Sequence, residues 1–348
     1  MKTSIRLLLA IILMILLVPQ VRAREEYTKI ITREYPVNPD AQLVLDNRFG
    51  TIHCNNWDKN VISVEVRITV TASSEETARK LLDMVTIAAS GSATLVEVKT
   101  SIAEGGFKGR TKVSIDYNVN MPATISLDLT NKFGDVFINE VGGKGKLNLA
   151  YGNMEINKLS NSDNLLDIKF SKVNVKFIKG AVVLLKYSDL ELDYAGSLLL
   201  DSKYSNLSAD KIIVLNVNFE GGRLEMENSS AVDSKSKFSD LGITRIEKSL
   251  NLDIQYGNCD VKEIAENFTS IAIENKYGNV SVGIPETASY SLDAELKYCD
   301  LDFPEDNANY TEKITTNTSK SYKAIIGKEK NPASRVSVRS EYGNVSFE

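Results

Sequence analysis

YGNCDV at Tyr256–Val261 and YGNVSV at Tyr277–Val282 are two copies of one short phrase: an aromatic residue, a small residue, Asp or Asn, and then alternating apolar residues. Further copies begin at Phe49, Phe133, Tyr151, Tyr187, Tyr204, Phe238, Tyr298 and Tyr342, and looser ones at Phe170 and Phe219. From Phe133 to Tyr298 the successive aromatic residues recur at a nearly constant interval of roughly 20 residues. A repeat of this length is typical of solenoids, in which each unit stacks on the next.

Apolar and polar residues alternate on both sides of the small-residue corner, as in Leu147, Leu149 and Tyr151 before it and Met154 and Ile156 after it. A period of two indicates strands. Gly and Asn tolerate positive φ, so this pair is expected to form the bend. Each repeat, or rung, is then two short strands, stacked in parallel about 4.8 Å from the next rung. The parity predicts an inward aromatic ladder of Tyr151, Phe170, Tyr187, Tyr204, Phe238, Tyr256, Tyr277 and Tyr298.

The expected fold is all-β, a parallel β-solenoid of about 10 to 12 rungs with an N-terminal α+β capping segment. Residues 24–130 hold the first rung and the cap, residues 131–303 the regular repeats, and residues 304–348 an irregular segment with the last rung. In the cap, Ser73 and Glu76 predict a capping box and a helix of about three turns. Near the other end, Ser321–Ile326 is interpreted as a degenerate rung between those of Tyr298 and Tyr342.

The start of the chain predicts export. Residues 1–23 contain two early basic residues, a short apolar run and Val21-Arg22-Ala23, which together form a cleavable signal peptide. Cleavage would remove three of the 41 basic residues and leave 38 against 46 acidic ones, a net charge of −8. Such a chain is a poor candidate for binding nucleic acid. No later stretch is long and apolar enough to be a membrane helix, so the expected location is periplasmic, cell-surface or secreted.

Two columns of charge are expected on the outer face. Lysines directly precede the aromatic residues in most rungs, at Lys132, Lys169, Lys186, Lys203, Lys237, Lys276 and Lys297. Acids two residues earlier offset their mutual repulsion, at Asp167, Asp201, Glu274 and Glu295. This pattern predicts either a solvated, charge-balanced face or a flat surface for an anionic glycan or a partner protein.

The residues that usually carry catalysis are scarce. His53 is the single histidine, and its position alternates outward without metal ligands at suitable spacing. Cys259 and Cys299 lie in repeat positions two rungs apart, about 9.6 Å, which is too far for a disulfide. With Cys54 they are predicted to be free, buried thiols. We therefore assign no catalytic, cofactor-binding or metal-ligating residues.

Carboxylates are the remaining catalytic option. Stacked rungs would place corner carboxylates such as Asp189 and Asp240 at distances that suit glycoside cleavage. A polysaccharide hydrolase or lyase is thus the alternative function. A catalytic site should interrupt the repeat with long loops that build a cleft, whereas the rungs between Phe133 and Tyr298 are compact.

Asn131-Lys132-Phe133-Gly134-Asp135-Val136, its copy at Asn275–Val280, and Trp57-Asp58 ahead of an apolar strand resemble the bacterial putative-adhesin family of β-strand-repeat domains of unknown function. That family is related to the head domains of auto-transporter adhesins. The resemblance implies an exported, right-handed β-solenoid without defined catalytic residues. The expected function is therefore that of a non-enzymatic adhesin or cell-envelope structural module, with an unidentified protein or glycan as partner.

Overall fold

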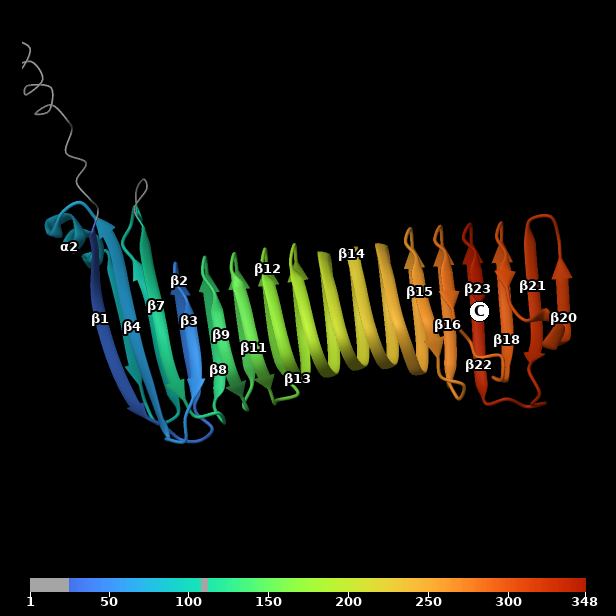
Figure 1. Ribbon diagram of the computed structural model, residues 1–348, viewed down its shortest axis with the longest axis horizontal. Helices are drawn as coiled ribbons and strands as arrows, with labels where there is room; N and C mark the ends of the chain where they lie inside the picture. Colours follow the sequence, from blue (N-terminus) through green and yellow to red (C-terminus); the bar gives the residue numbers. More distant parts are fainter. Residues whose placement is uncertain (1–24, 108–111) are drawn as a thin grey trace, which may run out of the picture.

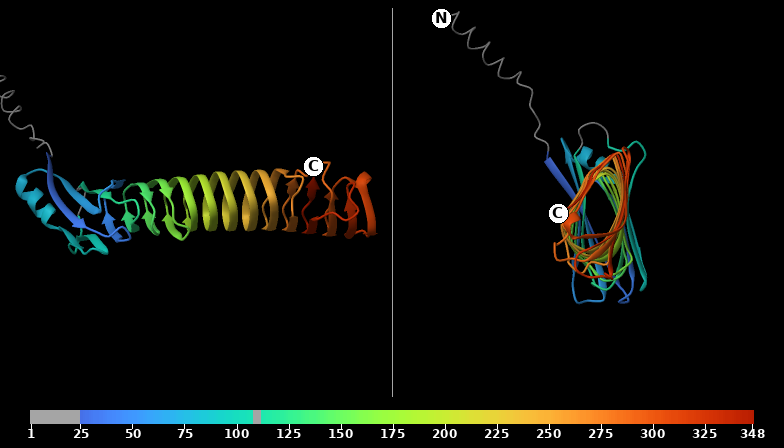
Figure 2. Two further views of the ribbon diagram at one scale, coloured as in Figure 1. Left: turned by 90° about the horizontal axis from the view of Figure 1, so that it is seen from below. Right: turned by 90° about the vertical axis from the view of Figure 1, so that its right-hand side faces the viewer.

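The computed structural model describes residues 25–107 and 112–348. It shows an elongated molecule built almost entirely of strands (Figure 1), which in end view form the wall of a flattened tube (Figure 2). The prediction of an all-β fold is therefore confirmed. The signal peptide predicted for residues 1–23 lies outside the described residues. Within the described part of the chain, no helix has both the length and the apolar character needed to cross a membrane.

The N-terminal end combines one rung with layers that cover it. Its elements are β1 (Glu25–Pro36), β2 (Gln42–Arg48), β3 (Ile52–Asn56), β4 (Val61–Ala72), α2 (Glu75–Asp83), β5 (Val85–Gly91), β6 (Leu95–Ile102) and β7 (Val113–Met121). Strands β2 and β3 form the first rung, and β6 and β7 pair with them in parallel on the outer side. Three further strands pair antiparallel with this layer: β5 with β6, β4 with β7, and β1 with β4. The free edge of the first rung is thereby paired.

The one α-helix among the described residues, α2, begins one residue later than the capping-box pattern predicted. Ser74 is the N-cap, and its hydroxyl accepts a hydrogen bond from the Thr77 amide at 3.3 Å. The pairing of Ser73 with Glu76 is therefore wrong, and Glu76 instead forms an exposed ion pair with Lys80. The helix ends at Asp83, and Val85 begins β5, where the chain returns as a strand antiparallel to β6.

The middle of the molecule consists of rungs that stack in chain order. Its strands are β8 (Ser126–Lys132), β9 (Val136–Val141), β10 (Gly145–Ala150), β11 (Asn153–Leu159), β12 (Asn164–Lys169), β13 (Lys172–Lys186), β14 (Asp189–Gln255), β15 (Cys259–Ile264), β16 (Ser270–Lys276) and β17 (Val280–Val282). Each residue pairs in parallel with its equivalents in the adjacent rungs, as Met154 does with Val136 and Val173. Buried aliphatic side chains from both walls fill the tube as one continuous core.

The C-terminal end departs from chain order. It contains β18 (Tyr290–Lys297), β19 (Leu301–Asp302), the 3-10 helix η1 (Glu305–Asn307), β20 (Ala308–Thr315), β21 (Ser319–Ile326), β22 (Ser334–Glu341) and β23 (Val345–Phe347). Strand β22 lies between β16 and β18, parallel to both, and β23 lies between β17 and β19 (Figure 1). The last rung of the sequence is therefore inserted between the two rungs that precede it.

The segment predicted as a degenerate rung has another role. Ser321–Ile326 belongs to β21, which pairs antiparallel with both β18 and β20. It therefore belongs to a capping hairpin at the C-terminal end of the tube, and the prediction of a rung is wrong. The hairpin was not recognised from the sequence, because β20 is exposed or half-buried along its length and therefore lacks the apolar alternation of a rung strand.

The aromatic ladder exists, but it lies outside the core. In every copy of the phrase that carries a ladder ring, the aromatic residue itself has a positive φ of 51 to 63°. This left-handed conformation reverses the alternation, so Leu147 and Leu149 point inward while Tyr151 points outward. The predicted inward ladder is therefore wrong, because we placed the bend at the Gly-Asn pair and it begins one residue earlier.

The small residue after each ring is required by close contact between rungs. A Cβ atom built on Gly152 would lie 2.1 Å from the carbonyl oxygen of Gly134. Where serine takes this position, its hydroxyl satisfies backbone groups: Ser188 donates to the Lys186 carbonyl at 2.9 Å and accepts from the Ser171 amide at 3.2 Å. The corner is thus held by local hydrogen bonds as well as by strand pairing.

Candidate functional site

One outer edge of the tube carries a column of aromatic rings. This aromatic column consists, in spatial order, of Phe49, Phe133, Tyr151, Phe170, Tyr187, Tyr204, Phe238, Tyr256, Tyr277, Tyr342 and Tyr298. Adjacent rings stack with centroids 4.9 to 5.4 Å apart and planes within 12° of parallel, except between Tyr204 and Phe238. All but Phe49 are 44 to 64% exposed. Contiguous exposed apolar surface of this kind commonly marks an interaction site.

The left-handed backbone at each ring is unfavourable by itself. It costs roughly 1 to 2 kcal/mol for a residue with a Cβ. Stacking between neighbouring rings contributes about 0.5 to 1.5 kcal/mol per pair, so a ring with two neighbours offsets most of this cost. Stacking therefore explains how eleven aromatic residues can hold a positive φ, and it leaves their outer edges free to contact a ligand.

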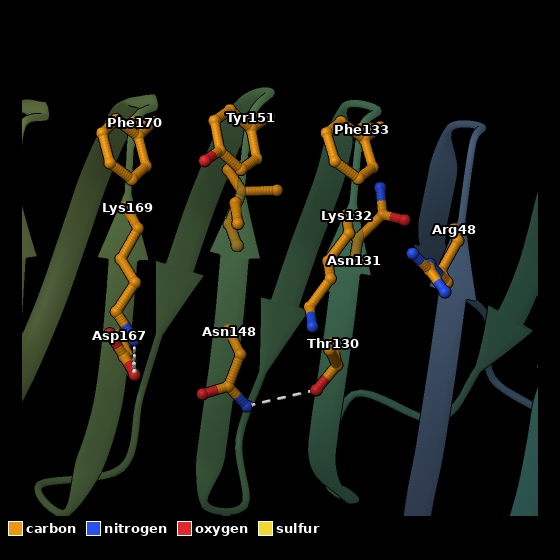
Figure 3. Close-up of a pocket in the computed structure, with 12 residues that line it drawn as sticks. Arg48, Thr130, Asn131, Lys132, Phe133, Asn148, Tyr151, Asp167, Lys169 and Phe170 are labelled. Atoms are coloured by element: carbon orange, nitrogen blue, oxygen red, sulfur yellow. Dashed lines mark hydrogen bonds and ion pairs between the residues drawn. The ribbon is translucent and has the colours of Figure 1, made fainter.

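Beside the aromatic column lies a hollow where the lysine column is interrupted. Lys132 in β8, Ala150 in β10 and Lys169 in β12 are register partners, so the alanine leaves a space between two lysines. Arg48 in β2 extends the same row on the far side of Lys132. The space has a volume of about 410 Å³, and Phe133, Tyr151 and Phe170 line its upper end (Figure 3). We call it the Ala150 hollow.

The charge balance of the outer face fails at this hollow. The acidic row two residues earlier holds Asp46 in the rung of Arg48, but Thr130 and Asn148 in the next two rungs. The Thr130 and Asn148 side chains hydrogen-bond to each other at 3.3 Å. Asp167 in the next rung is already paired with Lys169 at 2.9 Å. Within residues 25–107 and 112–348, neither Arg48 nor Lys132 forms an ion pair with a carboxylate. Figure 3 shows Lys132 extending along its strand toward Thr130, with Arg48 on the neighbouring strand.

The arrangement combines three kinds of contact. Two cations without a carboxylate partner can bind an anionic group, the Asn148 amide can donate or accept hydrogen bonds, and the exposed rings can stack on an apolar face. The hollow is therefore chemically suited to binding an anionic, partly apolar ligand.

His53 and the cysteines have structural surroundings. His53 is exposed and stacks on Phe137, with ring centroids 4.6 Å apart. All three cysteines are free; burial raises the pKa of Cys54 and Cys259 to about 12, while Cys299 is only half-buried. The inserted rung of β23 separates Cys259 from Cys299 by one rung more than chain order implied. The buried environments of Cys54 and Cys259 favour the unreactive thiol over the thiolate.

The corner carboxylates also have structural partners. Asp240 accepts hydrogen bonds from the backbone and side-chain nitrogens of Asn258 at 3.1 and 3.2 Å. Asp189 accepts from the Asn206 amide group at 2.8 Å. Across the described residues, no cluster of three or more His, Cys, Asp or Glu side chains could hold a metal ion. These hydrogen bonds between rungs account for Asp and Asn at the corner.

Sequence reasoning identified the lysine column as exposed, which is confirmed, but it did not identify the Ala150 hollow. The signal was present, because Ala150 replaces lysine in an otherwise regular column and the acids two residues earlier become Thr130 and Asn148. Arg48 could not be placed there from sequence, because β2 joins β8 across the whole capping segment from β3 to β7. The exposed rings were missed for the reason given above, the unexpected positive φ.

Comparison with known proteins gives a family and several distant structures. The sequence profile of the family described as Toastrack DUF4097 matches residues 160–348. No curated protein matches the chain. Similar solved structures include a putative adhesin from Bacteroides fragilis, 12% identical with a TM-score of 0.28, and one from Parabacteroides distasonis, 9% identical with a TM-score of 0.31. A putative lipid binding protein from Parabacteroides distasonis is 10% identical, with a TM-score of 0.27. Each alignment covers 92% of this chain and 97% of the other.

Proposed function

This chain belongs to the Toastrack DUF4097 family, and we propose that it is an exported, non-enzymatic β-solenoid that binds an acidic glycan at the cell envelope. The binding centre is the Ala150 hollow together with the adjoining rings of the aromatic column. Export rests on the signal peptide expected from residues 1–23, and right-handed winding remains a prediction from the family resemblance. The role is that of an adhesin or envelope interaction module.

The charge of the hollow is the observation that carries this proposal. The chain is acidic overall, yet Lys132 lies here beside Thr130 and Asn148, and the adjacent Arg48 forms no ion pair with Asp46 of its own strand. In the next rung, by contrast, Lys169 is paired with Asp167. Two neighbouring cationic side chains without a carboxylate partner favour an anionic ligand at this place, although the molecule as a whole is acidic. A sugar acid supplies a carboxylate for these cations and a ring face for the aromatic side chains.

The experiment is a binding and turnover assay on one panel of acidic and neutral polysaccharides. Lys132→Ala should weaken binding of an acidic polymer such as polygalacturonate at least about tenfold, the equivalent of one lost charge-assisted hydrogen bond. Lys276→Ala is the matched control, because Lys276 belongs to the same column but is paired with Glu341 at 3.3 Å. Its effect on binding should be small.

Ala150→Lys separates the shape of the hollow from its charge. The variant restores the lysine column and adds a positive charge, but it fills the space. We expect it to lose binding. Stronger binding by this variant would mean that charge alone recruits the polymer and would contradict a built site. Release of reducing ends that is abolished by Asp189→Asn or Asp240→Asn in a folded protein would overturn the non-enzymatic proposal in favour of a polysaccharide-cleaving enzyme.

A further inference from the structure

Aliphatic side chains are exposed together on the same wall of the tube as the Ala150 hollow. Val182 and Leu199 are register partners in adjacent rungs, and Leu184 follows Val182 by two residues on the same face. These three side chains are 37 to 53% exposed. The half-buried Leu165 pairs with Val182 from the other side. We call these four residues the aliphatic patch. Among the residues that the structure describes, the other exposed large aliphatic side chains are Ile30, Leu95, Val214 and Ile314.

The aliphatic patch interrupts the charge pattern of the wall, as the Ala150 hollow does. Leu184 takes the place of an acid, because its register partners are Asp167 on one side and Asp201 on the other. Lys186 therefore lacks the acid two residues earlier that Lys169 has. In the part of the chain that the structure describes, Lys186 forms no ion pair with a carboxylate, whereas Lys169 pairs with Asp167 at 2.9 Å. A cation without a carboxylate partner thus lies directly beside exposed aliphatic side chains.

A second hollow lies at this place and borders the first. It has a volume of about 260 Å³, and Leu184 and Lys186 line it together with Asp167 and Lys169. Asp167 and Lys169 also line the Ala150 hollow, where Figure 3 shows their ion pair. Ala150 and Lys186 pair with Lys169 from opposite sides. The two hollows are therefore centred two strand spacings apart, about 10 Å.

This inference rests on the proposed function and specifies its ligand. We propose that the ligand is an acidic glycolipid, whose sugar acid occupies the Ala150 hollow and whose hydrocarbon chain lies in the second hollow and across the aliphatic patch. One molecule can reach both places, because the hollows adjoin. The chain would remove exposed aliphatic surface from water, which is favourable in proportion to the area covered.

The size and charge of the surface favour a lipid chain over a protein. Four partly exposed side chains present at most a few hundred Å², whereas each partner in a stable protein complex buries about 800 Å². A second copy of this chain is disfavoured for a further reason, because it would bring its own lysine column close to the first. An anionic head on a hydrocarbon chain matches both the cationic and the aliphatic part of the surface.

The test compares soluble glucuronides that differ only in the length of their chain. Methyl β-glucuronide carries the acid without a hydrocarbon chain, and octyl β-glucuronide carries both. Binding is measured by ligand-observed NMR on the intact protein, below the concentration at which the octyl compound forms micelles. We expect the octyl glucuronide to bind at least about tenfold more tightly than the methyl one. Octyl β-glucoside, which has the chain without the acid, should bind at least about tenfold more weakly than octyl glucuronide.

A double variant, Leu184→Asn with Leu199→Ser, removes most of the aliphatic patch. Asn148 already occupies the position equivalent to Leu184 two rungs away, so the wall accepts this side chain. The advantage of the octyl chain should fall below about threefold, while binding of methyl glucuronide and polygalacturonate stays unchanged. Leu95→Ser is the matched control, because Leu95 is an exposed leucine of β6 outside the patch. This variant should keep the full advantage.

Three results would overturn the glycolipid. The first is equal binding of the two glucuronides by the parent protein. The second is an unchanged advantage of the octyl chain in a folded double variant, because the chain would then lie elsewhere. The third is octyl glucoside that binds as tightly as octyl glucuronide, which would indicate a general apolar site. The proposed function fails differently, through a Lys132→Ala variant that binds polygalacturonate as tightly as the parent.

Discussion

The middle and the C-terminal end of the tube use the same rung but assemble it differently. In the middle, Ala150 pairs with Lys169, which belongs to the next rung along the chain. At the C-terminal end, Ile273 pairs with Val338, which is separated from it in sequence by all of β17 to β21, because β22 enters between β16 and β18. Ring stacking is the same in both regions: the ring centroid of Tyr342 lies 5.1 Å from that of Tyr277 and 5.0 Å from that of Tyr298.

The comparison teaches that the repeated phrase determines how rungs join but not in which order. Every regular rung presents the same backbone edge, the same small corner residue and the same outward ring to both neighbours. Rungs are therefore locally interchangeable. Their order must depend on features outside the phrase, and here the antiparallel hairpin of β20 and β21 occupies the edge of β18 that a further rung would need.

The largest expected effect tests whether the inserted rung is as well packed as a central one. Phe219 in the middle and Phe347 in β23 are both buried, at 1 and 5% exposure. Changing either to Ala should reduce the free energy of unfolding by about 3 to 5 kcal/mol, the usual range for a buried aromatic side chain. Chemical denaturation of both variants measures this. A cost below about 1 kcal/mol for Phe347→Ala alone would indicate a frayed terminal rung and contradict the insertion.

A smaller effect is expected on the aromatic column. Tyr256→Ala in the middle and Tyr342→Ala in the inserted rung each remove two stacking contacts, at a cost of about 1 to 2 kcal/mol. The matched glycine variants should cost about 1 kcal/mol less than the alanine ones, because glycine adopts a positive φ without strain. Thermal melts of the four variants provide the ranking. If alanine were better tolerated than glycine at both positions, the left-handed conformation of the column would be in doubt.

The smallest effect concerns pH. Hydrogen bonds from Lys158, and further from Ser160, hold the pKa of Glu140 below its usual value. Lys297 and Lys276 lower the pKa of Glu341 in the same way, and Glu341 thereby connects the inserted rung to both neighbours. A lowered carboxyl pKa stabilises the fold above the unfolded pKa, and this contribution disappears as the pH falls through the folded pKa.

Glu140→Gln and Glu341→Gln should therefore be slightly less stable than the parent protein at pH 7, and the difference should vanish in acid. Denaturation midpoints at a series of pH values measure this. Parallel pH curves for variant and parent would show that these ion pairs contribute nothing to stability, as is common for exposed pairs.

The corner of the rung shows most clearly how much of the fold could be predicted from the sequence. The spacing of the phrase predicted the stacked strands, and alternation placed Leu149 and Met154 correctly in the core. It failed at Tyr151 because positive φ is rare for aromatic residues, and only stacking in three dimensions makes it favourable here. The periodic signal was sound, but the residue that bends was misidentified.

The site needed information that a local pattern does not contain. Ala150 is the smallest residue in its column and was visible in the sequence as an interruption of the repeated lysine. The consequence of this substitution depends on neighbours in other rungs, because Arg48 joins Lys132 across a long gap in sequence. A missing side chain becomes a site only when stacking places other side chains around it.

The insertion of β22 and β23 also has a consequence for how the chain reaches its final state. A tube that grows from its N-terminus can add rungs one at a time as synthesis proceeds, each on an edge that is already present. In this protein, stepwise addition stops after β17, because the rung that packs next to it is formed by β22 and β23, residues 334–347. The segment from β18 to β21 must wait for them, so completion of this end depends on contacts of long sequence separation, which form slowly. The C-terminal end of the tube therefore cannot be completed before residues 334–347 have been synthesised.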